Sequence, residues 1–568
     1  MRYGQTGYER MNDYYDLGTY SRPITTTSLQ AQTWFDRGLI WTYGFNHEEA
    51  IRCFERALEF DPHCAMAYWG LAYASGPYIN KEWSFYTHEE LEHCLPLIAD
   101  AIEKGGKFAE GGTEAERAMI DALKSRYQST TVQPIEEMNR WNFDFADAMS
   151  AVYSKFPEDR DIISIYAEAM MMKTPWRLWD TKTQKAAEGA DTVKMLAVLE
   201  NGLRLAKRGN LDPHPGLGHM MIHTVEMSPY PEWALEAADG LRTIAPDSGH
   251  LCHMPTHIDA LCGHYYDALV ASERSIEADK KYLAQFGPFG QYTAAVCHDN
   301  HLKMFVSMFL GRWDKAIEAA DMICEILTDE VLLQSTPAFQ ITLEAYYSMR
   351  MHVFVRFGKW QEIIDEPMPE NSDLYPVTTA MHHYAKGIAF ATLKNFDAAG
   401  EERENFERTV STISKDRHLF NNTSRSVLAI AREMMCGEIY YHKGYYVSAF
   451  SHLRQAVALS DGLFYTEPWA WMHPPRHALG ALLLAQDHVE EAEAVYRADL
   501  GLDGTVNRAN VHPDNIWSLH GFVECLEKLD KMEEVAIWRQ KLNEALLFND
   551  VPITSSCACR IVESCCAG

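Results

Sequence analysis

Long apolar runs are missing from this 568-residue sequence, and none approaches the roughly 18 to 20 residues needed to span a bilayer. Strand signals are equally scarce, because alternating Val, Ile and Thr bounded by hairpin turns hardly occur. Basic charge is in deficit: 80 Asp and Glu stand against 51 Lys and Arg, a formal net charge of -29. Such a surface repels polyanions, so we expect neither nucleic acid nor a membrane as a partner.

The first residues also lack a basic segment followed by an apolar one, so we expect no secretory signal and a cytoplasmic protein. In a reducing compartment most of the 13 cysteines should be thiols. The last twelve residues hold four of them, which could bind copper(I) or zinc, and a frayed tail without a specific role is the alternative. These residues are Cys557, Cys559, Cys565 and Cys566.

Helical repeats are the dominant pattern that the sequence does contain. Residues 34–62 closely resemble the tetratricopeptide repeat, a pair of amphipathic helices. The small residues Gly38, Ala50 and Ala57 fall where the two helices would touch, and Asp61–Pro62 ends the unit. Weaker copies begin near residues 263, 311, 358, 387, 437 and 480.

Such hairpins bury their apolar faces only by stacking, so the prediction is an all-α fold, a right-handed superhelix (α-solenoid) with loop insertions. We assign residues 29–548 to the solenoid, 1–28 to an N-terminal extension and 549–568 to a Cys-rich tail. Loop-rich interruptions are expected at residues 75–115, 173–192 and 284–300, because they carry Gly, Pro and aromatic residues out of helical register.

Histidines are concentrated in one part of this array: nine of the 24 lie between residues 214 and 301. His219 and His223 are four residues apart, so on a helix they share one face with Glu226. Two imidazoles one turn apart can chelate a metal ion, and a carboxylate at the next turn can ligate it or orient a ligand. Met220 stands where a zinc protease would carry its glutamate, which argues against that chemistry.

Two further groups follow this pair. His250, His253 and His257 share a face if their segment is helical throughout, but Pro255 either kinks that helix or starts a new one. The third group is an i, i+3 pair, and helices of consecutive repeats could direct all three groups into one cavity. The predicted metal ligands are therefore His219, His223, His250, His253, His257, His298 and His301.

The metal is predicted to be copper, with iron and zinc as alternatives. An all-imidazole set without a thiolate disfavours a closed structural zinc site. Seven histidines could divide as three plus three around two ions, as in coupled dicopper centres, with one to spare. Thioethers at Met220, Met221 and Met254 suit copper, although methionine beside histidine is also ordinary core packing.

The stretches 219–226 (HMMIHTVE) and 249–257 (GHLCHMPTH) resemble a family of large tetratricopeptide-like proteins from bacteria and fungi. The similarity runs from about residue 30 to 530 and includes Glu168 and the segment 515–521. The resemblance implies a tetratricopeptide superhelix and indicates that the histidines form a motif. It brings no established reaction, but it is compatible with a fungal biosynthetic enzyme.

Three functions remain open from the sequence. The first is a metal-dependent oxidoreductase or oxygenase acting on a small-molecule substrate, with Glu226 or Glu168 as proton carrier or ligand orienter. The second is a metal-assisted hydrolase or lyase. The third is a non-enzymatic scaffold that holds a peptide or protein in the superhelical groove. For the enzyme, the expected substrate pocket is lined by Met171, Trp176, Trp179 and Tyr292.

Overall fold

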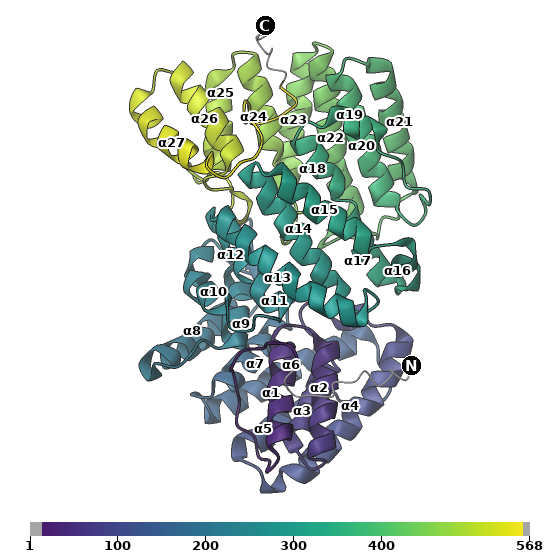
Figure 1. Ribbon diagram of the computed structural model, residues 1–568, viewed down its shortest axis with the longest axis vertical. Coiled ribbons are helices and arrows are strands. Elements are labelled where there is room, and N and C mark those ends of the chain that lie inside the picture. Colours follow the sequence, from purple (N-terminus) through teal and green to yellow (C-terminus); the bar gives the residue numbers. More distant parts are fainter. Residues whose placement is uncertain (1–13, 561–568) are drawn as a thin grey trace.

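The computed structural model describes residues 14–560 and consists of helices stacked in antiparallel pairs (Figure 1). The expectation of an all-α repeat superhelix is confirmed, because the described strands have only two residues each. These strands form two hairpins, in which β1 (Trp179–Asp180) pairs with β2 (Lys185–Ala186) and β3 (His418–Leu419) with β4 (Asn422–Thr423). None of the helices in residues 14–560 is long and apolar enough to cross a membrane.

The helices run in three successive blocks. The N-terminal block comprises α1 (Leu29–Tyr43), α2 (His47–Phe60), α3 (Ala65–Ala74), α4 (His88–Phe108), α5 (Glu114–Arg126), α6 (Ile135–Lys155), α7 (Arg160–Met171) and α8 (Thr192–Gly209). The central block comprises α9 (Pro215–Val225), α10 (Leu235–Leu241), α11 (Gly249–His253), α12 (Pro255–Cys262), α13 (Tyr265–Phe286), α14 (Thr293–Leu310), α15 (Trp313–Ile326), α16 (Asp329–Gln334), α17 (Pro337–Tyr347) and α18 (Arg350–Arg356). The C-terminal block comprises α19 (Trp360–Asp365), α20 (Pro376–Thr392), α21 (Phe396–Thr412), α22 (Ser424–His442), α23 (Tyr446–Asp461), α24 (Pro475–Ala485), α25 (Val489–Asp499), α26 (Ile516–Lys528) and α27 (Met532–Ala545).

The first repeat shows why these residues form a hairpin. The ring of Phe54 on α2 lies against Gly38 of α1 and Gly70 of α3, where an added Cβ would come within 2.7 Å and 2.4 Å of it. Ser28 caps α1 and Asn46 caps α2 through their side-chain oxygens. The glycines therefore let three helices close around one aromatic ring.

The predicted insertions are shorter than expected. Residues 88–108 form the long helix α4, which Thr87 and Glu90 start with a capping box, so the loop-rich prediction for 75–115 was wrong over that helix. The connector predicted at 284–300 is irregular only between α13 and α14, and His298 lies inside a helix. The interruption at 173–192 does contain a short hairpin, β1–β2.

The N-terminal segment is tied to the repeats through one buried carboxylate. Asp161 at the start of α7 accepts hydrogen bonds from Tyr20 (2.6 Å) and Tyr43 (2.7 Å) and pairs with Arg22 (2.7 Å) and His214 (3.2 Å). Burial alone would raise the pKa of Asp161, but the guanidinium and these hydrogen bonds outweigh it and hold that pKa well below its usual range. The cluster fixes α1, α7 and α9 relative to one another.

The C-terminal end of the described chain also packs on the repeats. Arg560 makes a bidentate ion pair with Glu524 of α26, and Cys559 is fully buried. Cys557 and Cys559 are joined by a disulfide, whereas Cys565 and Cys566 lie outside the described residues. The other described cysteines are free, as expected.

Candidate metal centre

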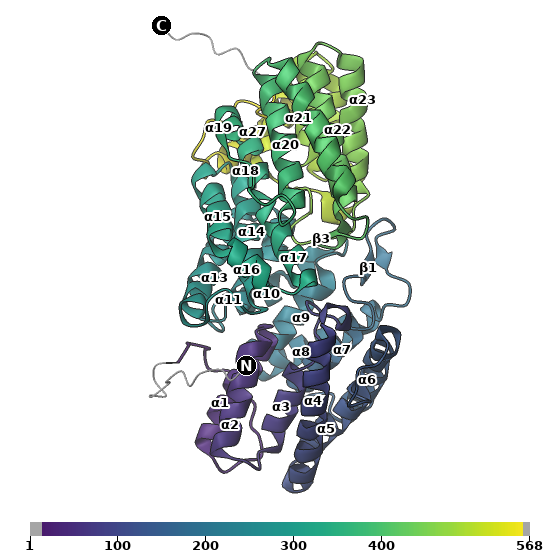
Figure 2. The same ribbon diagram turned by 90° about the vertical axis from the view of Figure 1, so that its right-hand side faces the viewer.

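The helices of the histidine region occupy the middle of the molecule. In two perpendicular views, α9, α11 and α14 lie between the N-terminal helices and the C-terminal block (Figure 1, Figure 2). Pro215 occupies the first turn of α9, and His214 caps it by accepting a hydrogen bond from the Leu217 N–H. Pro255 starts a new helix, α12, so the second of the two arrangements predicted for this proline is the observed one.

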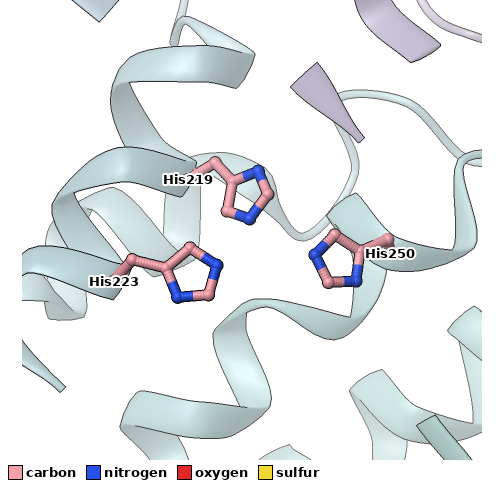
Figure 3. A group of neighbouring side chains, drawn as sticks. All are labelled: His219, His223 and His250. Carbon is pink, nitrogen blue, oxygen red and sulfur yellow. The ribbon is translucent and has the colours of Figure 1, made fainter. Parts of the chain in front are cut away.

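Three imidazoles converge from α9 and α11, and we call His219, His223 and His250 the first triad. One ring nitrogen from each lies within 4.8 Å of the others, and all three residues are buried (Figure 3). The Nδ1 of His219 contacts the carbonyl oxygen of Tyr43 at 2.5 Å, and that of His223 contacts Glu226 at 2.8 Å. Their Nε2 atoms, and both ring nitrogens of His250, have no hydrogen-bond partner among the described residues. Buried nitrogens left in this way fit a ligand that the chain itself does not supply.

A second group, the second triad, is formed by His253, His257 and His298 from α11, α12 and α14. The Nε2 of His257 lies 2.8 Å from that of His253 and 3.3 Å from that of His298. A metal–nitrogen bond of about 2.0–2.1 Å sets two ligand nitrogens about 2.9 Å apart at a right angle and about 3.4 Å apart at the tetrahedral angle. The two distances from His257 therefore match those between imidazoles around one ion.

Glu226 links the two triads. Its Oε1 lies 2.8 Å from the Nδ1 of His223 and its Oε2 lies 3.0 Å from the Nδ1 of His257. A carboxylate in that position fixes the tautomer of both rings and directs both Nε2 atoms away from itself. The Nδ1 of His253 lies 3.5 Å from the Thr256 hydroxyl and 3.3 Å from the Asp299 carboxylate.

Sequence reasoning missed Glu467, which lies in the loop between α23 and α24. Its Oε2 is 3.3 Å from the Nδ1 of His257 and 3.8 Å from the Nε2 of His298. The side-chain amides of Asn421 and Asn422 hold this loop by donating to the carbonyl oxygens of Tyr465 and Phe464. Spacing could not have found Glu467, but a single acidic residue inside the apolar stretch 463–472 was a usable signal.

The charges of the site follow from burial and these carboxylates. Burial holds the pKa values of His219, His250 and His253 well below the usual range and lowers that of His298 to about 3. Burial also lowers the pKa of His223, but Glu226 and Glu467 outweigh it and raise that pKa to about 9. The same balance raises the pKa of His257 to about 10. Four of the six rings are thus neutral and able to ligate.

The remaining predicted metal ligand and carboxylate lie at the edge of this centre. His301 belongs to neither triad; its ring stacks on Phe420 and meets Tyr346 edge-on. Glu168 is buried and accepts a hydrogen bond from Tyr73. Burial raises the pKa of Glu168, and the charge of His223 acts in the opposite direction.

The residues predicted to line one substrate pocket have separate surroundings. Trp176 meets His223 edge-on at 5.9 Å between ring centroids and donates its indole N–H to Ile79 O. Trp179 donates to the carbonyl oxygen of Thr224. Tyr292 donates to Asp279 and accepts from the backbone N–H of His250, so it supports α11. Met171 is fully buried in the core.

Comparison with known proteins identifies one tetratricopeptide repeat in the chain and only weak similarity to solved structures. Residues 31–64 match the family model of the tetratricopeptide repeat. No curated protein matches the chain significantly. Among solved structures, a human IFIT1 dimer with m7Gppp-AAAA shares 10% identity over 90% of this chain and 97% of its own, with a TM-score of 0.32. Yeast Tom70 shares 14% identity over 91% and 96%, with a TM-score of 0.27. Similarities this weak support no argument about function.

The fold and the site define a helical-repeat protein with a buried histidine–carboxylate centre. The chain is an array of stacked helical hairpins, and residues 31–64 of it match the family model of the tetratricopeptide repeat. The histidine groups could hold a metal ion, as predicted.

Proposed function

We propose that this protein is a metal-dependent oxidoreductase with two metal ions, one in each histidine triad. The observation that carries the proposal is the convergence of two sets of three imidazoles, all buried except His298, with several of them anchored through Nδ1. A core that only needed packing would not leave so many buried ring nitrogens unpartnered. The three-plus-three division favours a pair of ions over a single one.

Copper is the metal that we propose. Six imidazoles and no thiolate suit copper, and divalent copper binds nitrogen sites most tightly among the first-row metals. When bound, two copper ions supply one-electron redox chemistry at each ion, with dioxygen as electron acceptor. Iron would support related chemistry, whereas zinc has no redox activity and would indicate a hydrolase.

The chain's own residues would orient the ligands and carry protons. Glu226 holds one imidazole of each triad, and Glu467 lies beside the second triad. A two-electron oxidation of an organic substrate also releases protons, and these carboxylates are placed to receive them. His298 is 12% exposed in its side chain and Glu467 6%, so a small-molecule substrate would approach from the second triad.

Elemental analysis tests the proposal on protein purified without a polyhistidine tag. We expect about two copper ions per chain, one of them lost in His219→Ala and the other in His253→Ala. His301→Ala is the matched control, since that ring lies outside both triads, and it should retain both ions. Zinc alone would favour the hydrolase, and absence of any metal after reconstitution would overturn the proposal.

A scaffold function is the second candidate, and the repeat match at residues 31–64 is the observation that favours it. Tetratricopeptide arrays commonly hold peptides in their groove. A scaffold predicts that replacing the triad histidines leaves partner binding unchanged. Co-purification of a peptide or protein with both His219→Ala and wild type, in the absence of metal, would support this alternative.

A further inference from the structure

Strained aromatic residues surround the histidine centre. In residues 14–560, nine non-glycine residues have positive φ, a conformation that costs an L-residue about 1 kcal/mol or more. Three of them are aromatic: Phe45 (φ 55), Trp176 (φ 58) and Phe420 (φ 53). Each places its ring against a histidine of the predicted set. The polar residues with positive φ are Gln184, Asn210, Lys394, Asp487, Asp514 and Asp530.

Phe45 is the exception among equivalent turns. The hairpin between α1 and α2 turns through Phe45 in the left-handed conformation. Later hairpins of the array turn through glycine, aspartate or, once, lysine in the same conformation, and glycine and aspartate tolerate it better than phenylalanine does. Those residues are Gly263, Gly311, Gly358, Lys394, Gly444, Asp487 and Asp530. The turn that faces the first triad therefore carries a large aromatic ring, that of Phe45, where the later turns carry none.

The ring of Phe45 touches every member of the first triad. Its centroid lies 4.3 Å from that of His219, 5.9 Å from that of His223 and 5.4 Å from that of His250, the last two in stacked orientation. Trp176 meets His223 edge-on, with its indole fixed by a hydrogen bond to Ile79. These two rings cover the first triad with hydrocarbon, and we call them the aromatic wall.

The second triad has different surroundings. Glu467 lies within 3.8 Å of His223 as well as of His257 and His298, so this carboxylate does not distinguish the triads. Exposure does, because the side chain of His298 is 12% exposed and that of His223 is 1% exposed. An opening gives water or a substrate the access that a covering of hydrocarbon denies. The two triads therefore differ in access although their ligands are alike.

We propose that Phe45 and Trp176 keep water and external ligands away from the metal in the first triad, so that substrate reaches only the metal in the second. This inference rests on the proposed two-metal function and assigns the two ions different tasks. The strained turn at Phe45 is then the structural cost of this wall.

Azide titration of the copper-loaded protein tests this assignment by absorption spectroscopy. Wild type should bind about one azide per chain, and Phe45→Gly about two, because removing the ring opens the first triad to small ligands. Glycine suits the left-handed turn, so the variant should keep its fold, which circular dichroism checks. Phe45→Leu is the matched control, since it keeps hydrocarbon at the same strained position and should still bind about one. Trp176→Ala is a second way to open the wall.

The outcomes separate the two proposals. Absence of bound metal in wild type would overturn both the two-metal function and the wall. Two bound metals with two azides in wild type would overturn the wall alone. The same holds if Phe45→Gly and Trp176→Ala each keep two metals and still bind a single azide.

Discussion

Glu226 should control the affinity of both metal sites, because one carboxylate accepts from an imidazole of each triad. Removing such an outer partner costs about 10–100-fold in metal affinity, or about 1.4–2.7 kcal/mol for each ion. Glu226→Ala should therefore weaken both sites. Competition with a chelator, with metal counted by elemental analysis, measures the two affinities.

Glu226→Gln should behave differently from alanine. A carboxylate offers two acceptors, whereas an amide offers one acceptor and one donor group. The glutamine oxygen can satisfy either His223 or His257, and its amide nitrogen then faces the N–H of the other ring. One ion should be weakened about 10–100-fold and the other held nearly as in wild type.

Glu344→Gln provides the charge control for both variants. Glu344 on α17 is buried, and it accepts from Thr378 and pairs with Arg417. The substitution removes one buried negative charge without touching the contacts that hold His223 and His257. Unchanged affinity of both sites in Glu226→Ala, or equal weakening in Glu344→Gln, would refute the reasoning.

Two predictions concern stability. Asp161→Asn removes the buried partner of Arg22, which keeps its ion pair with Asp159, and should cost about 1.5–3 kcal/mol at pH 7. Because the folded pKa of Asp161 is depressed, its contribution is full above about pH 3.9 and lost as the pH falls toward the folded pKa. Urea unfolding at pH 7 and pH 3 checks this, and a pH-independent difference would contradict it. Gly70→Ala should lose about 1–2 kcal/mol, since its Cβ would lie 2.4 Å from the ring of Phe54. In Gly106→Ala, where nothing lies within 4 Å, thermal unfolding should instead show a small gain.

The fold was largely predictable from local pattern. The spacing of Gly38, Ala50 and Ala57 predicted the hairpin of α1 and α2, because small residues are required wherever two helices approach closely. Helix α4 was missed because its apolar positions lie among Gly, Pro and His residues that resemble a loop. The capping box at Thr87 and Glu90 was the local signal that this segment is helical.

Part of the site could be predicted from the sequence, and part depends on the tertiary structure. Helical spacing by itself determined that His219 and His223 share a face with Glu226 nearby, since that geometry is internal to one helix. Which triad each histidine joins was decided by the tertiary structure, because His250 and His253 lie on the same helix, α11, yet His250 joins His219 and His223 of α9 and His253 joins His257 and His298.

Contacts between distant segments could not be predicted from the periodicity of the sequence. Glu467 contacts the second triad from a loop that follows the nearest of its histidines by more than 160 residues. Phe45 contacts the first triad from the first repeat, far before these histidines in the chain. Periodicity reports only on neighbours within one helix or one hairpin. The approach of the first repeat and the 463–474 loop to α9, α11 and α14 depends on how the whole array stacks, which only the tertiary structure decided.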